Sequence, residues 1–278
     1  MAAPALPRRR AGNYSVSSDK YGLSKSGVLP AADNGGNYVL PVGSETGALL
    51  TKIDADTETI EWEIAGENIR TKHPVYVIGG QLTEENNFHT LIDLGCKAAR
   101  GLNTNAAAKY TAIWNKYATL EINRIDGAGP ITYWGTNAGI TYHAGDVLSA
   151  LTGRCGTWSD MFIKTCQLQG VTVGKIHFET VSRLNYLYQD AENFQGGSPS
   201  PERIFGDHVV NTFGNTIYDV TCGVTADDIR SYIIDNVKVD KVIGVTYNDG
   251  IPSYVYERID ITEANLDTYI NIFYLNGE

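Results

Sequence analysis

The stretch 207–221 constrains the fold of this chain most, because it predicts a β-hairpin of defined register. Two runs rich in strand-forming residues flank Gly214-Asn215, a dipeptide suited to a two-residue turn. With that turn, Phe213 pairs with Thr216, and the pairing continues outward along both strands. Side chains alternate between the two faces of a hairpin, which groups a set of residues on one face: His208, Val210, Ile217, Asp219 and Thr221.

The predicted hairpin brings a histidine close to a carboxylate. His208 and Asp219 become diagonal neighbours on adjacent strands, a separation that long side chains bridge. A carboxylate in this place fixes the tautomer of an imidazole and stabilises its charged form. The pair therefore predicts a general base and the acid that orients it.

A cysteine between two glycines lies upstream, where a loop is predicted to turn into a helix. Apolar residues at helical spacing follow it and end at Gly170; they are Trp158, Phe162, Ile163 and Cys166. Cys155 lies at or just before the first helical turn, where free N–H groups and the helix dipole favour a thiolate. Gly153 and Gly156 are expected to leave room around the sulfur for a substrate carbonyl. The alternative is a buried structural cysteine, since free cysteine is among the most buried residue types.

These two stretches together predict a catalytic triad. A nucleophile at a helix start, with a base and its orienting acid on adjacent strands, is the arrangement that thiol catalysis requires. The residues in these roles are Cys155, His208 and Asp219.

The same residues resemble the core of the transglutaminase-like superfamily. The resemblance is carried by Arg154-Cys155-Gly156-Thr157-Trp158-Ser159, Asp207-His208-Val209 and Tyr218-Asp219-Val220-Thr221. The order Cys, His, Asp matches, as do the separations of 53 residues (155 to 208) and 11 residues (208 to 219). The Cys-Gly-x-Trp pattern is closest to peptide N-glycanase-type and bacterial cysteine hydrolases. The resemblance covers roughly residues 85–225, about half of the chain, and the long polar insert 188–206 departs from the family pattern, as a lid or without function.

The resemblance implies an α+β fold with a papain-like core, in which the cysteine helix packs on an antiparallel sheet that carries His and Asp. It implies acyl-enzyme chemistry on an amide bond, completed by water in a protease, amidase or deamidase, or by an amine in a crosslinking acyltransferase. Hydrolysis is favoured, because the relatives with the closest motif are mostly hydrolases. The alternative is a catalytically silent binding or structural module, since some members keep the fold and lose the triad.

Further residues are candidates for the oxyanion hole or the cleft. The backbone N–H of Cys155 is one oxyanion donor. In crosslinking transglutaminases a tryptophan upstream of the cysteine assists the oxyanion, which makes Trp134 a candidate, with a wall or core position as the alternative. Gly156 and Trp158 complete the set.

Composition limits the partners. A formal net charge of −10 argues against nucleic acid and anionic membranes as partners. The resemblance implies a protein or peptide substrate, and the oligomeric state is left open. No Cys-x-x-Cys pair or phosphate-binding loop is present, and we expect no metal and no cofactor. Cys222 is interpreted as a packing residue, with a redox partner of Cys155 as a less favoured role. No apolar run is long enough for a signal peptide or a membrane span, which favours the cytoplasm.

Three regions are predicted along the chain. Residues 1–36 lack apolar periodicity and are expected to form a flexible arm. Residues 37–84 form a β-rich accessory region, in which 60–64 alternate as a half-buried strand. Residues 85–278 form the catalytic domain, with a C-terminal hairpin extension that turns at Asn248-Asp249-Gly250. The last stretch, 266–275, fits a helix or a strand equally well.

Overall fold

The computed structural model describes most of the chain after residue 75 and short strands before it. The described residues are 14–15, 17–18, 23–24, 38–39, 48–54, 59–64, 70–74, 76–102, 104–135, 139, 141–197 and 203–275. The chain divides into two compact units, Met1–Gln81 and Leu82–Glu278, whereas the sequence placed its main boundary between 84 and 85. Each unit is described by itself.

The N-terminal unit is built from antiparallel strands. Its main sheet has the order β4-β5-β6-β7, and two further pairs join β1 to β8 and β2 to β3. The strands are β1 (Tyr14–Ser15), β2 (Ser17–Ser18), β3 (Leu23–Ser24), β4 (Tyr38–Val39), β5 (Ala48–Asp54), β6 (Thr59–Ile64), β7 (Arg70–Pro74) and β8 (Tyr76–Val77). The strand expected at 60–64 is β6. The flexible-arm prediction for 1–36 concerns residues that, apart from β1 to β3, lie outside the described part of the chain.

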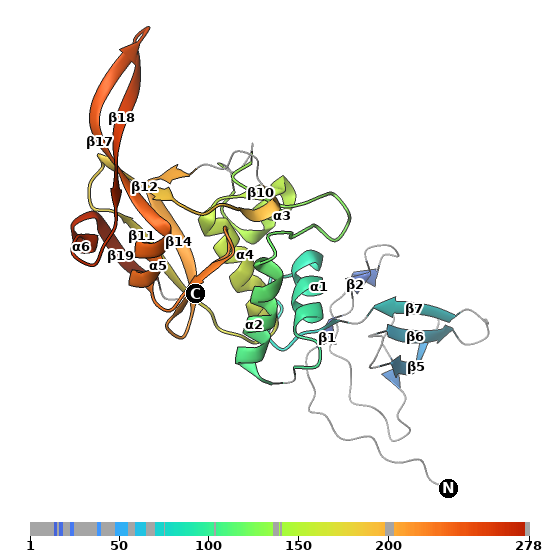
Figure 1. The fold of residues 1–278 in the computed structure, drawn as a ribbon. Coiled ribbons are helices and arrows are strands. Elements are labelled where there is room, and N and C mark those ends of the chain that lie inside the picture. Colours follow the sequence, from blue (N-terminus) through green and yellow to red (C-terminus); the bar gives the residue numbers. More distant parts are fainter. Residues whose placement is uncertain are drawn as a thin grey trace. The chain divides into compact units, whose positions relative to one another are not determined.

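The C-terminal unit has a helical side that is organised around one central helix. Its helices are α1 (His89–Ala98), α2 (Ala106–Tyr117), α3 (Ala144–Ala150), α4 (Cys155–Leu168), α5 (Ile229–Asn236) and α6 (Leu266–Tyr269). Helix α4 contacts α1, α2 and α3 (Figure 1). The side chain of Asn105 caps α2 by accepting a hydrogen bond from the N–H of Ala108, as its residue type favours.

A five-stranded antiparallel sheet packs against α4. Its order is β16-β15-β14-β11-β19. The strands are β11 (Gly174–Thr180), β14 (Asp207–Phe213), β15 (Thr216–Asp219), β16 (Val224–Ala226) and β19 (Ile270–Leu275). The stretch 266–275, for which helix and strand were equally possible, divides into the short helix α6 and the strand β19.

The hairpin of β14 and β15 has the predicted register. Phe213 pairs with Thr216, and the ladder continues outward through Thr212 and Ile217. Gly214 has a φ of 65°, the positive value that the first position of a type II′ turn requires. The turn therefore sets which side chains share a face.

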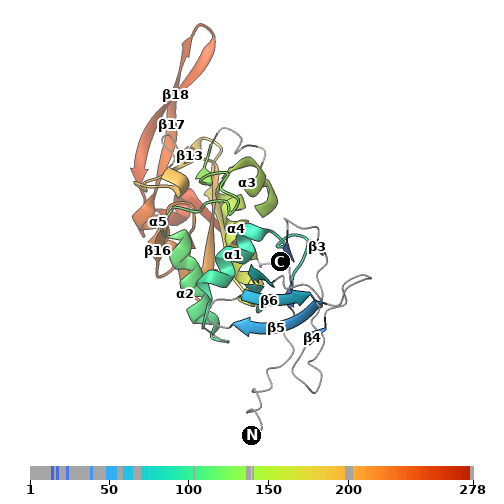
Figure 2. The ribbon, with the colours of Figure 1, turned by 90° about the vertical axis from the view of Figure 1, so that its right-hand side faces the viewer.

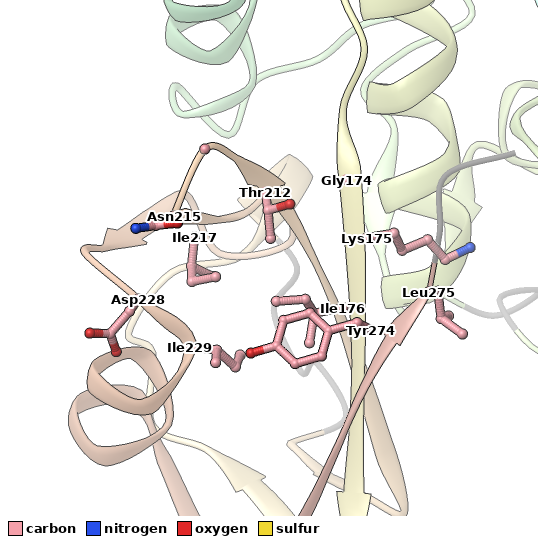
Figure 3. Close-up of a pocket in the computed structure, with 11 residues that line it drawn as sticks. Gly174, Lys175, Ile176, Thr212, Asn215, Ile217, Asp228, Ile229, Tyr274 and Leu275 are labelled. Carbon is pink, nitrogen blue, oxygen red and sulfur yellow. The ribbon is translucent and has the colours of Figure 1, made fainter.

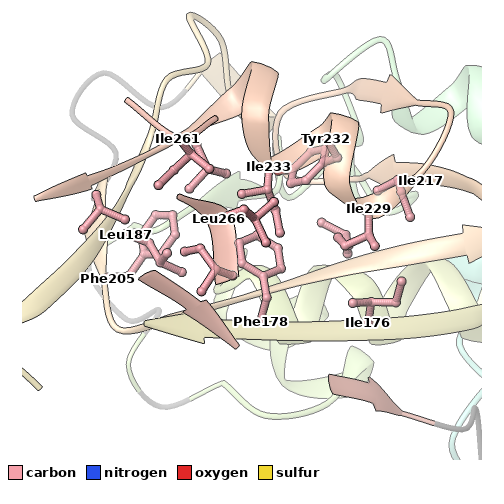
Figure 4. Close-up of a cluster of buried hydrophobic side chains, with 14 residues drawn as sticks. Ile176, Phe178, Leu187, Phe205, Ile217, Ile229, Tyr232, Ile233, Ile261 and Leu266 are labelled. Carbon is pink, nitrogen blue, oxygen red and sulfur yellow. The ribbon is translucent and has the colours of Figure 1, made fainter. Parts of the chain in front are cut away.

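The two faces of this sheet have different neighbours (Figure 1). On one face Asn211 donates a hydrogen bond to Ser159 of α4. The other face belongs to a hydrophobic cluster with α5 and neighbouring strands (Figure 4). The buried members are Ile176, Phe178, Leu187, Phe205, Val210, Ile217, Ile229, Tyr232, Ile233, Val237, Val239, Ile261, Leu266 and Ile270. This packing buries His208 and Asp219 at the base of the hairpin, whereas the turn at Gly214 is exposed.

A second sheet carries a long hairpin. Its order is β13-β12-β17-β18. The strands are β12 (Asn185–Gln189), β13 (Ile204–Phe205), β17 (Val237–Asn248) and β18 (Ile251–Asp260). Within β17, strand β12 pairs with residues 237–241, and the outer parts of β17 and β18 project from the rest of the unit (Figures 1 and 2). Asp249 and Gly250 both have positive φ, which confirms the predicted turn.

The insert 188–206 contributes to this second sheet in its described part. It holds the end of β12, a short 3₁₀ turn η2 (Gln195–Gly197) and β13. Two further short strands, β9 (Thr132–Tyr133) and β10 (Thr152–Gly153), pair in parallel just before α4. The unit thus combines helices with mainly antiparallel sheets, which confirms the α+β class, while the papain-like core stays a prediction. Among the described residues, no helix is both long and apolar enough to span a bilayer.

Candidate active site

Cys155 is the first residue of α4, as the glycine and apolar spacing predicted. It is 8% exposed, and its N–H belongs to the first turn, where backbone donors have no intrahelical acceptor. The side chain of Thr157 accepts a hydrogen bond from the N–H of Arg154 at 3.1 Å, which fixes the entry of the chain into the helix. The sulfur therefore lies at the positive end of the α4 dipole.

The two glycines that flank this position differ in what they do. A Cβ on Gly153 would lie 2.7 Å from Cγ2 of Val147, so the glycine permits close packing against α3 and does not make room for a substrate. A Cβ on Gly156 would meet only Val209, at 3.9 Å, which is ordinary van der Waals contact. Of the two glycines, Gly156 alone keeps space open beside the cysteine.

His208 and Asp219 form a buried pair at the base of the hairpin. Nε2 of His208 lies 2.8 Å from Oδ2 of Asp219, and both side chains are 0% exposed. The imidazole is stacked on Phe205, with ring centroids 5.2 Å apart, and meets the edge of Phe178 at 5.5 Å. Packing on both sides leaves the ring one orientation.

Asp219 accepts hydrogen bonds from several elements at once. Its Oδ1 accepts from the backbone N–H of Thr221 at 2.9 Å and from the hydroxyl of the same residue. Its Oδ2 accepts from His208, from the thiol of Cys222 at 3.1 Å and from the hydroxyl of Tyr232. So many donors on one carboxyl group require the ionised form, which accepts only.

The electrostatics follow from this geometry. Burial alone would raise the pKa of Asp219, but the charge and hydrogen bond of His208, with the hydroxyls of Thr221 and Tyr232, hold that pKa well below its usual range. Burial alone would lower the pKa of His208, but Asp219 and then Cys155 outweigh it, so the pKa of His208 is raised. Each member of the pair thus favours the charged form of the other.

One nitrogen of the imidazole remains for the cysteine. Asp219 occupies Nε2, while Nδ1 of His208 is buried and has no hydrogen-bond partner among the described residues. Cys155 lies close enough to contribute to the raised pKa of His208. The structure thus brings the three predicted residues together, with the imidazole between the thiol and the carboxylate.

Two donors to Asp219 escaped the sequence analysis. Tyr232 lies on α5, 13 residues beyond Asp219, and its hydroxyl also contacts Gln189 Nε2 at 3.2 Å. No sequence signal links a core aromatic of one helix to a carboxylate on another element. Cys222 was interpreted as packing, yet its thiol donates to Asp219. Burial, followed by the charge of Asp219, raises the pKa of Cys222 well above its usual value, which opposes a redox role.

The two tryptophan candidates lie in different surroundings. Trp158 is 0% exposed, donates from Nε1 to the carbonyl of Thr132 at 3.4 Å and meets Tyr117 edge-on, so it is a core residue and does not line an open cleft. Trp134 is half-buried, and its N–H donates to the carbonyl of Gly153 at 3.0 Å. The guanidinium of Arg154 lies over the indole of Trp134, 4.9 Å from the ring centroid.

Two hollows of the C-terminal unit do not contain the triad. One, of about 460 Å³, lies beside the hairpin turn and is lined by Gly174, Lys175, Ile176, Thr212, Gly214, Asn215, Ile217, Asp228, Ile229, Tyr274 and Leu275 (Figure 3). Another, of about 570 Å³, includes Leu120, Phe194 and Gly196 in its wall. With the Cys155 side chain only 8% exposed, a substrate carbonyl reaches the sulfur only if neighbouring groups move.

Within the described part of the chain, no three His, Cys, Asp or Glu side chains are grouped to hold a metal ion. Comparisons of the chain with protein-family models, curated proteins and solved structures found no match. A functional assignment therefore depends on the site geometry and on the resemblance of the three motifs.

Proposed function

We propose that this chain is a transglutaminase-like cysteine enzyme that acts on amide bonds of a protein or peptide through Cys155, His208 and Asp219. The observation that carries the proposal is the buried imidazole between a helix-start cysteine and a carboxylate 2.8 Å from Nε2. Asp219 accepts hydrogen bonds from five donors, and Nδ1 of His208 is left for the Cys155 thiol, an arrangement that favours a functional pair over an isolated structural histidine.

In the proposed reaction the thiolate of Cys155 attacks the amide carbonyl carbon, and the oxyanion is stabilised by the free N–H of the first helical turn. The imidazolium of His208 passes its Nδ1 proton to the amide nitrogen, the C–N bond breaks and an acyl-enzyme remains. Water then attacks the acyl group, His208 takes a proton from that water, and the C–S bond breaks to restore the thiolate. Asp219 keeps Nε2 protonated and the ring in place throughout.

Hydrolysis is preferred to amine transfer in this proposal, because the closest motif belongs to families of hydrolases. The two outcomes share the acyl-enzyme and differ only in the group that resolves it. With a glutamine peptide as substrate, ammonia release without incorporation of a fluorescent alkylamine indicates hydrolysis, and incorporation of the amine indicates transfer.

A catalytically silent module is the second candidate, and the burial of Cys155 favours it. The thiol is 8% exposed, and the described hollows lie elsewhere. In such a module the triad would survive as a buried polar network without turnover.

Selective alkylation separates these candidates. The four cysteines are all buried, with exposed fractions of 8% for Cys155, 5% for Cys96, 5% for Cys222 and 0% for Cys166, so accessibility alone predicts similar rates. An active site predicts that a limiting dose of iodoacetamide modifies Cys155 first, as located by peptide mass spectrometry. Equal and slow labelling of all four would contradict the enzyme proposal. His208→Ala is the matched variant, in which the selectivity should disappear.

A further inference from the structure

A positively charged side chain stands beside the candidate nucleophile. Arg154 immediately precedes Cys155 and is exposed. The guanidinium groups of Arg124, Arg230 and Arg258 all bind carboxylates. Among the described residues, no carboxylate pairs with Arg154, although the chain carries a net charge of −10. The positive charge of Arg154 is therefore available to an anionic ligand.

The position of this guanidinium is held by its surroundings. It lies over the indole of Trp134, 4.9 Å from the ring centroid, a contact that orients a planar cation. Strand β10 pairs with β9, and the backbone N–H of Trp134 donates to the carbonyl of Gly153, so the backbone of Trp134 is held beside the residue before Arg154. A Cβ on Gly139 would come within 3.2 Å of Nη2 of Arg154, so the chain also approaches the guanidinium at that residue.

The backbone of Trp134 supports the same interpretation. Its φ is 53°, in the left-handed region that bulky residues rarely adopt. Such strain persists where the surrounding structure demands it, and it is concentrated at binding sites. Here the residue with the unusual φ is the one on which the guanidinium of Arg154 is stacked.

We propose that Arg154, supported by Trp134, is a subsite for an anionic group, so that preferred substrates carry a carboxylate near the amide bond that is attacked. The inference rests on the function proposed above. Consecutive Cα atoms are about 3.8 Å apart, so the side chains of Arg154 and Cys155 leave the backbone at neighbouring points. A guanidinium presents a fork of donors that matches both oxygens of a carboxylate. An acidic side chain or a terminal carboxylate of a peptide has this chemistry.

Two alkylating reagents test the subsite without a known substrate. Iodoacetate is an anion and iodoacetamide is its neutral analogue, so the ratio of their rates at Cys155 reports the local positive potential. Removal of this positive charge in Arg154→Gln should lower the iodoacetate-to-iodoacetamide ratio about two- to sevenfold at low salt, the range for charges about 7 to 12 Å apart in an effective dielectric constant of about 40 to 80. About 1 M salt should remove most of this difference, since screening then acts over about 3 Å.

Matched variants make the result specific. Arg154→Lys keeps the charge but loses the planar contact with Trp134, so its ratio should lie between those of the parent and Arg154→Gln. Arg230→Gln changes the net charge equally, from the helix on the opposite face of the sheet, and should leave the ratio unchanged. A ratio that is the same in Arg154→Gln and the parent would overturn the subsite while leaving the reactive cysteine intact. Slow reaction of Cys155 with both reagents in the parent would instead overturn the proposed function, and the subsite with it.

Discussion

Removal of one hydroxyl, by Tyr232→Phe, isolates the support that α5 gives to Asp219. The Tyr232 side chain is fully buried, and its hydroxyl donates to Oδ2 of Asp219. The ring belongs to the hydrophobic cluster, so the variant keeps its packing and loses the polar contacts of the hydroxyl with Asp219 and Gln189. A hydrogen bond to a charged group contributes about 1.5 to 3 kcal/mol. We therefore expect the free energy of unfolding of the C-terminal unit to fall by about 2 kcal/mol at neutral pH.

Tyr110→Phe is the matched control for this variant. Tyr110 is also 0% exposed, but its hydroxyl has no hydrogen-bond partner among the described residues. Removing a buried hydroxyl that makes no bond costs nothing and relieves its desolvation, so the free energy of unfolding should stay unchanged or rise. The chemical change is identical at both sites, so the difference between the variants measures the polar contacts of the Tyr232 hydroxyl, with Asp219 as the charged partner and Gln189 as the neutral one.

The pH dependence of the Tyr232→Phe effect tests the charge of the acceptor. The pKa of Asp219 is held below its usual range, so the stability that its charge contributes is present above about pH 4 and is lost as pH falls through the lowered value. Because the bond from Tyr232 helps to lower this pKa, the deficit of Tyr232→Phe relative to the parent should shrink on acidification.

Urea unfolding at about pH 7 and at successively lower pH, down to the lowest pH at which the C-terminal unit still folds, measures these free energies by linear extrapolation. Tryptophan fluorescence is a suitable probe, since Trp114, Trp134 and Trp158 all belong to the C-terminal unit. Equal losses in Tyr232→Phe and Tyr110→Phe would refute the reasoning, because the bond to Asp219 would then contribute nothing. A deficit independent of pH would show that Tyr232 stabilises the unit without acting on the carboxylate.

Four further outcomes are expected. Cys155→Ala should change the free energy of unfolding by no more than about 1 kcal/mol, by urea titration, and abolish turnover of any amide that the parent cleaves. Asp219→Asn should lower the reaction rate by orders of magnitude, as loss of the carboxylate does in the comparable serine triad (about 10⁴-fold), and should narrow the pH range of rapid Cys155 alkylation. If the alkylation rate depends on pH in the same way in Asp219→Asn and the parent, but differently in His208→Ala, Asp219 does not orient His208. Since the pKa of His208 is raised, the stability that its charge contributes is fully present below about pH 6.5 and is lost as pH rises through the raised value. The difference in urea midpoint between the parent and His208→Gln should therefore decrease as pH is raised from about 6 to about 9. Replacing 243–255 by an Asn-Gly turn should leave the melting temperature unchanged within about 2 °C, because these residues project from the unit and expose large side chains such as Tyr247, which is 72% exposed. A large drop in melting temperature would show that the outer hairpin stabilises the rest of the C-terminal unit.

The parts of the site that depend on local chemistry could be predicted from the sequence. The turn at Gly214 sets the register of the hairpin, and the alternation of side chains then places His208 and Asp219 on one face. The start of α4 at Cys155 follows from the glycines and the apolar spacing around it. Each of these inferences needs only neighbours within a few residues or a single pairing rule.

The position of Trp158 could not be predicted in the same way. Periodicity separates a buried face from an exposed one, and it fails for a helix that is covered all round. In α4, 10 of 14 residues are buried, because three helices and a sheet enclose it. A tryptophan near the nucleophile therefore suggested a cleft wall, whereas the helix core contains it.

The contacts that complete the triad lie outside the residues that suggested it. The family resemblance extends to about residue 225, but the hydroxyl that binds Asp219 comes from Tyr232 on α5, and Gln189 on β12 contacts that hydroxyl in turn. These contacts depend on α5 packing into the hydrophobic cluster across the sheet from α4. A fully buried carboxylate remains ionised because hydrogen-bond donors surround it, since an unsatisfied buried charge is costly. The charge state of the triad is therefore a property of the folded C-terminal unit, and three short motifs identify its residues without determining their ionisation.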